Sequence, residues 1–208
     1  LRQSLAYWRQ QLAGCPPLEL PTDHPRPAGL SCRGSILTFS LDARLGTELK
    51  ALAQSQQATL FMTLLGSFAL LLSRYSQQTD LAIGSPIANR TCTEMEPLIG
   101  CFVNTLILRP SLEGDPSFRE LLGRLRELCL DAYSHQELPF ERLVDELHLG
   151  RDRSRNPLFQ VMFMLQNAPL GELRLPGLQC SYLFVHHRTA KFDLTLALEE
   201  RADGGLTG

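Results

Sequence analysis

The chain has 208 residues, 44% of them hydrophobic, which is enough to bury a sizeable core as one domain or one large lobe of a bigger domain. Its 20 basic and 22 acidic side chains give a net charge of -2, without the basic surface that nucleic-acid binding usually requires. The longest apolar stretch, residues 60–72, is shorter than the roughly 20 residues that cross a bilayer. We therefore expect no nucleic-acid partner and no membrane partner.

The cysteines and histidines form no pattern typical of a metal site or a disulfide framework. The six cysteines lack a CxxC pair, and Cys101 and Cys129 fall inside apolar patterns, where a free thiol packs as a small hydrophobe. The five histidines are widely separated except for His186 and His187, and no carboxylate or cysteine stands at ligand spacing. We expect reduced thiols, no bound metal and a cytoplasmic location.

The first 33 residues predict a helix followed by an extended segment. Apolar residues recur every three or four positions, and Gly14 supplies a stop, so a helix is expected within residues 1–14. Residues 15–33 contain five prolines, which fix an extended path across a surface. An α/β body at residues 34–208 is expected to follow.

Apolar periodicity and turn signals predict the elements of this body. The first half is expected to contain a strand at 34–42, a helix at 43–56, a buried helix capped by Thr59, and strands at 80–85 and 101–109. The second half is expected to contain a helix at 116–133 with Asp115 as N-cap and Pro116 in its first turn, a helix beginning at Pro139, strands at 158–165 and 191–199, and a final turn. Interleaved strands and helices without repeats indicate an α/β fold, a mixed β-sheet covered by helices.

Two polar features adjoin the expected core strands and allow two interpretations each. Asn104 lies in a strand that is apolar on both faces, so its amide needs a partner, either a neighbouring loop or a ligand in a channel. The charged residues 151–155 are either a solvated loop or an anchor. In the second case Arg155 and Asn156 would bond to backbone carbonyls and fix a loop. The loop between the strands at 80–85 and 101–109 is long enough to carry function.

Three motifs carry a family resemblance: IGCFVNTLILRP at 99–110, HQELPFERL at 135–143 and RDRSRNPLFQVMFMLQN at 151–167. LELPTDHPRP at 18–27 and TAKFDLTL at 189–196 extend it over almost the whole chain. In this order the motifs resemble the condensation domains of nonribosomal peptide synthetases. The resemblance implies two chloramphenicol-acetyltransferase-like lobes with a tunnel between them, and the chain is similar to the C-terminal lobe.

The catalytic histidine motif of that family, HHxxxDG, belongs to the N-terminal lobe and has no match here. His186 and His187 are a decoy, because Asp193 comes two places late and is followed by Leu194. We interpret the pair as two half-exposed histidines at the end of a strand. The chain is therefore expected to be a lobe truncated at both ends, since it also stops before the last helix of the family. A nucleophile elbow is also missing, because Ser85 lacks the second glycine of that motif.

The resemblance implies amide formation between substrates held on the phosphopantetheine arms of donor and acceptor peptidyl carrier proteins, with no cofactor bound to this chain. The N-terminal lobe and an adjacent adenylation domain are further implied partners. Residues expected near the tunnel are Ser85, Asn89, Arg90, Asn104 and Thr105. Residues expected to hold the motifs in shape are Gly100, Phe102, Arg109, His135, Gln136, Pro139, Phe140, Arg155, Asn156, Phe159 and Gln160.

No catalytic residue is expected in this chain, and the isolated lobe is predicted to be inactive. One alternative is a non-catalytic module that binds carrier proteins or a neighbouring domain, and another is a relative of the epimerisation type. A third is a complete, divergent acyltransferase that uses His135 or His187.

Overall fold

The computed structural model describes residues 1–147, 152–166, 175, 177–180, 185 and 188–208. Six strands form one mixed sheet in the order β1-β6-β5-β4-β2-β3. The strands are β1 (Ser40–Leu41), β2 (Ile83–Ile87), β3 (Asn104–Leu108), β4 (Val161–Gln166), β5 (Leu194–Glu200) and β6 (Leu206–Thr207). The helices are α1 (Arg2–Leu12), α2 (Ala43–Ser55), α3 (Leu60–Ser76), η1 (Thr93–Met95), α4 (Phe118–Ser134) and α5 (Phe140–Glu146). This mixed sheet with helices confirms the predicted α/β fold.

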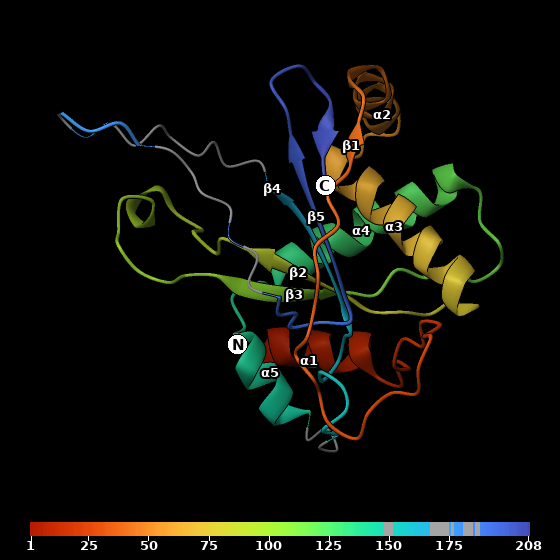
Figure 1. Ribbon diagram of the computed structural model, residues 1–208. Helices are drawn as coiled ribbons and strands as arrows, with labels where there is room; N and C mark the ends of the chain where they lie inside the picture. Colours follow the sequence, from red (N-terminus) through yellow and green to blue (C-terminus); the bar gives the residue numbers. More distant parts are fainter. Residues whose placement is uncertain (148–151, 167–174, 176, 181–184, 186–187) are drawn as a thin grey trace.

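The central strands set the topology of the sheet. β4 pairs in parallel with β2 and with β5, whereas β2 and β3 form an antiparallel pair. Figure 1 shows α2, α3 and α4 gathered on one side of the sheet, with α1 and α5 together at one end. The buried face of α3 packs Phe61 and Phe68 against Phe163 of β4, with ring centres 5.3 and 5.9 Å apart.

The predicted helices are confirmed, with one correction at a cap. The Asp42 and Thr59 side chains accept hydrogen bonds from Leu45 N and Met62 N at the starts of α2 and α3. α4 begins at Phe118 rather than Pro116, because Ser117 forms a capping box with Glu120. Asp115 is not the N-cap. It has a left-handed φ of 48° after Gly114 at 80°, so the chain is still turning there.

Helix α5 begins at Phe140 with Pro139 as its N-cap, one residue later than predicted. The long apolar stretch predicted as a buried helix forms α3, which follows α2 closely in the chain. Within the described residues no single helix is both long and apolar enough to cross a membrane, and α2 with α3 meets that criterion only as a pair bent by 104°.

Several strand boundaries differ from the prediction, because pairing decides them and apolar content does not. β2 and β3 pair from Ile87 with Asn104 onward, so β3 starts three residues after Cys101, which is exposed. The strand predicted at 34–42 is reduced to β1, beside an 85% exposed Leu37. The predicted final turn is present at residues 202–204, but it leads into β6, in which the buried Leu206 pairs with Leu41 and Glu200.

The proline-rich segment crosses the ends of the sheet, as predicted. It has no helix, and residues along it bond to distant elements. Leu18 N donates to Gln160 Oε1 at 2.7 Å, Leu30 N donates to Arg153 O at 3.0 Å, and Arg33 forms a bridge with Thr189. Backbone hydrogen bonds therefore fix the route of residues 15–33.

Arg109 ties helix α1 to the sheet. Its Nε and Nη2 donate to the two carboxylate oxygens of Asp80, both at 2.7 Å, and its Nη1 donates to Gln11 O and Ala13 O at 2.8 and 2.9 Å. The hydrogen bonds with Asp80 raise the pKa of Arg109 above its ordinary value. This fork of bonds fits a guanidinium and would not be reproduced by lysine.

Candidate functional site

The Asn104 amide is fully occupied by main-chain groups. Its Nδ2 donates to Gln136 O at 2.8 Å and Leu138 O at 2.9 Å, while its Oδ1 accepts from Thr105 N at 2.9 Å and Phe140 N at 3.0 Å. An asparagine amide has two donor hydrogens and an acceptor oxygen with two lone pairs, so no group is left for a ligand. Of the two interpretations of Asn104, the structural bond to a neighbouring loop is the one observed.

Apart from Thr105 in β3, the residues bound by Asn104 lie where α4 connects to α5. We call Asn104 and the main-chain groups of residues 105, 136, 138 and 140 the Asn104 cluster. Asn104 and Leu138 are buried, and Phe140 packs its ring 5.6 Å from that of Phe159. Gln136 therefore serves through its backbone, Phe140 through both its backbone and its ring, and Pro139 is the N-cap of α5.

His135 is held in a packing role. Its main-chain oxygen accepts from Trp8 Nε1 at 3.1 Å, and its ring stacks on Tyr7 with the centroids 4.3 Å apart. Burial, with a smaller contribution from Asp131, raises the pKa of Tyr7 to about 12, so this hydroxyl stays protonated and is no nucleophile. The surroundings of His135 give no support to an acyltransferase that uses it. His187 lies outside the described residues.

Ser85 and Thr105, both expected near a tunnel, lie on opposite faces of the sheet. Ser85 pairs with Leu106 and Thr105 with Pro86, and neighbouring positions along a strand point to opposite faces. Ser85 is buried, whereas Thr105 is half-buried. At β5 the face that carries Thr105 is open, because Thr195, Ala197 and Glu199 are exposed there, whereas Ile107 of β3 is buried on the same face. The register therefore separates two residues that the sequence had grouped.

Arg90 lies inside the long loop at residues 88–103. Its Nη1 donates to Met95 O and to Glu96 O, the latter at 3.2 Å, and its Nη2 donates to Leu98 O at 2.9 Å. Its Cζ also stands 4.3 Å from the centre of the Phe102 ring. The charge of Arg90 is therefore used within the loop.

The same loop carries apolar side chains on its outside. Leu98, Ile99 and Val103 are 52%, 105% and 63% exposed, although large aliphatic side chains are usually buried. Gly100 faces the Phe102 ring, which would stand 3.0 Å from a Cβ at that position. Figure 1 shows the loop projecting beyond β2 and β3. An exposed apolar group of this kind is typical of an interaction surface.

The anchor predicted at Arg155 and Asn156 is formed, with one change in its partners. Asn156 Nδ2 donates to Lys191 O at 2.6 Å, as predicted. Arg155, in contrast, faces carboxylates rather than carbonyls, with Nη1 2.6 Å from Glu19 Oε1 in a charge contact that is not aligned as a hydrogen bond. Gln160 is buried and bonds Leu18 N and Asn156 O.

Phe159 explains a glycine in β2. Its ring is buried and stacks on Phe192 with the centroids 5.2 Å apart. A Cβ at Gly84 would overlap this ring, so the ring passes directly over the β2 backbone. Phe159 of the motif at 151–167 thus requires a glycine at position 84.

Sequence reasoning missed the partner of Asp193. This carboxylate forms a bidentate ion pair with Arg26, whose Nη1 also donates to Ser154 O at 3.2 Å. The hydrogen bonds with Asp193 raise the pKa of Arg26. The only sequence signal was the arginine between two prolines in residues 18–27. Asp193 therefore fastens the extended segment to the start of β5.

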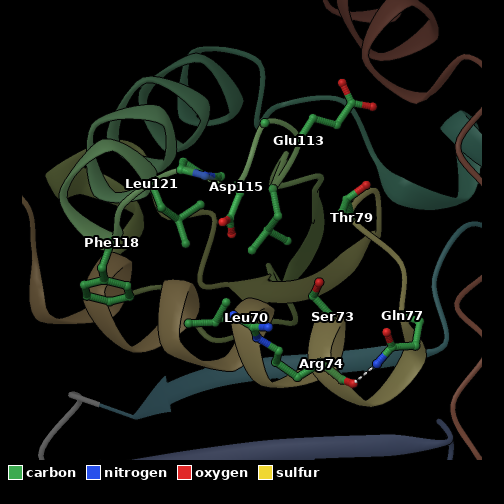
Figure 2. A pocket seen from close by; sticks show the side chains of 12 residues that line it. Leu70, Ser73, Arg74, Gln77, Thr79, Glu113, Asp115, Phe118 and Leu121 are labelled. Carbon is green, nitrogen blue, oxygen red and sulfur yellow. Dashed lines mark hydrogen bonds between the residues drawn. The ribbon is translucent and has the colours of Figure 1, made fainter.

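A shallow cleft of about 360 Å³ lies away from all of these residues. Figure 2 shows it between the end of α3, with Leu70 and Arg74, and the turn that holds Glu113 and Asp115. It contains none of the residues predicted near a tunnel. Among the residues that the structure describes, no three histidine, cysteine or acidic side chains gather as a metal site.

The mixed sheet and its helices define the class of the protein, a chloramphenicol-acetyltransferase-like acyltransferase fold. The X-domain from teicoplanin biosynthesis superposes with a TM-score of 0.89 at 31% identity, covering 100% of this chain and 48% of that chain. A four-domain nonribosomal peptide synthetase bound to AMP and glycine gives a TM-score of 0.90 at 27% identity, covering 99% of this chain and 17% of that chain.

The family follows from the sequence comparison. The family model of the Condensation domain matches residues 1–207. A linear gramicidin synthase from Brevibacillus parabrevis is 51% identical over 207 residues, which cover 98% of this chain and 4% of that protein. This chain belongs to the condensation-domain family, and the resemblance seen in its motifs is confirmed. It spans a small fraction of the length of the multidomain synthetases it matches.

Proposed function

We propose that this chain is the C-terminal lobe of a two-lobe condensation domain that forms an amide bond between substrates carried by donor and acceptor carrier proteins. The observation that carries the proposal is its coverage of a solved relative. It matches in full yet covers 48% of the X-domain chain, so a second part of similar size completes that fold. In this proposal the second part supplies the HHxxxDG histidine, and this lobe supplies a wall of the tunnel.

The open face of the sheet and the projecting loop support this role. The proposed tunnel wall includes the half-buried Thr105, whose face of the sheet is open at β5, together with Asn89 and Arg90 at the root of the loop. Asn104 and Ser85 would act from behind the wall, because Ser85 is buried and the amide of Asn104 is fully bonded. The apolar tip formed by Leu98 and Ile99 is the proposed contact with the N-terminal lobe.

The chemistry assigns the two lobes different tasks. Amide formation needs a group that takes the proton of the attacking ammonium, and donors for the developing oxyanion. Within the described part of the chain, His135 is stacked on Tyr7 in a packing role. We therefore propose that the lobe positions substrates, while the phosphopantetheine arms are delivered by carrier proteins and an adenylation domain stands next to it.

The test is an amide-forming assay with loaded donor and acceptor carrier proteins. This chain is assayed alone, with a separately produced N-terminal lobe that carries HHxxxDG, and with that lobe bearing an alanine at its second histidine. Product is expected only from the two intact lobes together. Product from this chain alone would contradict the proposal in favour of a complete acyltransferase. If this chain binds the carrier proteins but no amide product forms even when the N-terminal lobe is present, a non-catalytic interaction module is favoured.

A further inference from the structure

We infer that Arg90 is a positioning residue, which holds the loop at residues 88–103 in the shape that docks on the N-terminal lobe. The inference rests on the proposed function, since it names the group that prepares this chain for its partner. Arg90 touches no reacting atom in this scheme. It acts through the loop that it organises.

Arg90 gathers the loop from within. The turn before it has Asn89 at a left-handed φ of 52°, which directs the chain into the loop. The two Nη atoms of the guanidinium then donate to carbonyls of three residues, 95, 96 and 98, and its Cζ lies 4.3 Å from the centre of the Phe102 ring. One side chain thus joins the first part of the loop to the η1 helix and to the last part of the loop.

Burial cannot order this loop in place of Arg90. None of the apolar residues at positions 91–101 belongs to the buried core, and Ile99 is 105% exposed. The main-chain bonds within the loop are local ones, such as Met95 N to Cys92 O at 3.0 Å and Leu98 N to Met95 O at 3.2 Å. Local turns of this kind do not fix the path of a loop of this length. Among the described residues, Arg90 is therefore the side chain that ties distant parts of this loop together.

The outer surface indicates the chemistry of the partner. Positions 97–104 read PLIGCFVN, without a charged side chain, and Leu98, Ile99 and Val103 are displayed to solvent. The matching surface is therefore apolar, and salt should change its affinity little. A loop that already has its bound shape avoids the entropy cost of ordering on association. Arg90 supplies this order before the lobes meet.

The geometry also predicts that lysine is an incomplete replacement. An ammonium keeps the charge and a cation–π contact with Phe102, but it is a single point, whereas the carbonyls are shared between Nη1 and Nη2. Arg90→Lys should therefore restore part of the function that Arg90→Ala loses. Arg126, which is exposed on α4, offers a matched control through Arg126→Ala.

The experiment measures binding of this chain to the HHxxxDG-bearing lobe of the same synthetase by titration calorimetry, with hydrogen exchange of the free chain as a second readout. Arg90→Ala is expected to weaken binding about tenfold or more, with Arg90→Lys between it and the wild type and Arg126→Ala unchanged. Exchange of the amides at 93–101 should quicken in free Arg90→Ala and be protected again in the complex.

The pair Arg90 and Phe102 gives a further readout that a general loss of fold would not produce. Arg90→Ala with Phe102→Leu should cost less than the sum of the two single losses in binding. Equal binding by Arg90→Ala and the wild type, or additive losses in the double variant, would overturn the inference. If the wild-type chain fails to bind the other lobe, the proposed function itself fails, so the two failures are distinguishable.

Discussion

The Asn104 cluster and the loop at residues 88–103 are each organised by one polar side chain that binds several main-chain groups. The two regions differ in the burial of that side chain and of its surroundings. Asn104 is buried, and its bonds join β3 to the segment between α4 and α5. Arg90 is half-buried, and its bonds stay within one loop whose apolar side chains face solvent. The first arrangement should stabilise the fold, and the second should shape a surface. Four predictions separate these roles.

The largest effect is expected from Asn104→Leu. The substitution removes four hydrogen bonds and leaves the four main-chain groups of the Asn104 cluster without these partners at a buried or half-buried site. We expect a loss of roughly 3 kcal/mol in the free energy of unfolding, measured by urea denaturation. Gln54→Leu, which replaces an exposed amide on α2, should have little effect and serves as control. An equal loss of unfolding free energy in Asn104→Leu and Gln54→Leu would contradict a stabilising role of the Asn104 cluster.

Alkaline pH should lower the free energy of unfolding through the buried Cys129 thiol of α4. Burial raises the pKa of the Cys129 thiol from 9.0 to about 12, so the folded state holds this proton more tightly than the unfolded state. Stability is then retained below about pH 9 and falls as the pH rises toward 12. At pH 10.5 the loss is about 2 kcal/mol by linkage. Urea denaturation from pH 8 to 10.5 should show a shallower decline for Cys129→Ala, and parallel declines would contradict the assignment.

Asp193→Asn should loosen the extended segment without unfolding the body. It keeps the size of the side chain but removes the charge that pairs with Arg26. We expect a loss of about 1 kcal/mol, because the pair is partly solvated. Hydrogen exchange should quicken at residues 24–33, whereas Glu48→Gln, in the exposed pair with Arg44, should leave exchange unchanged. Unchanged exchange in Asp193→Asn would show that backbone bonds alone hold the segment.

The smallest effect on stability is expected from Arg90→Ala. Its bonds are confined to a projecting loop that contributes no residue at 91–101 to the core, so the free energy of unfolding should change by less than about 0.5 kcal/mol. Thermal unfolding followed by circular dichroism measures this change. A large drop in Tm would show that Arg90, like Asn104, stabilises the fold, and would contradict its assignment to shaping a surface loop.

The positions of helices followed closely from the sequence, whereas strand ends and the predicted tunnel residues did not. Helix α2 begins at Ala43, as its predicted range had it, and α3 begins after the predicted cap Thr59, because a cap bonds to an amide three residues away. A strand needs a neighbour that is distant in the chain. Residues 101–103 are apolar enough for a strand but have no pairing partner beyond Ile87.

The sequence by itself determined the fold class, the family and the need for a partner at Asn104. These depend on local periodicity, motif order and the cost of burying an amide, all of which can be read along the chain. The tertiary structure decided which groups satisfy Asn104, that Ser85 and Thr105 face opposite sides, and that Asp193 meets Arg26. Those contacts join residues far apart in the chain. Their distances depend on strand register and on the path of the proline-rich segment, which only the folded chain fixes.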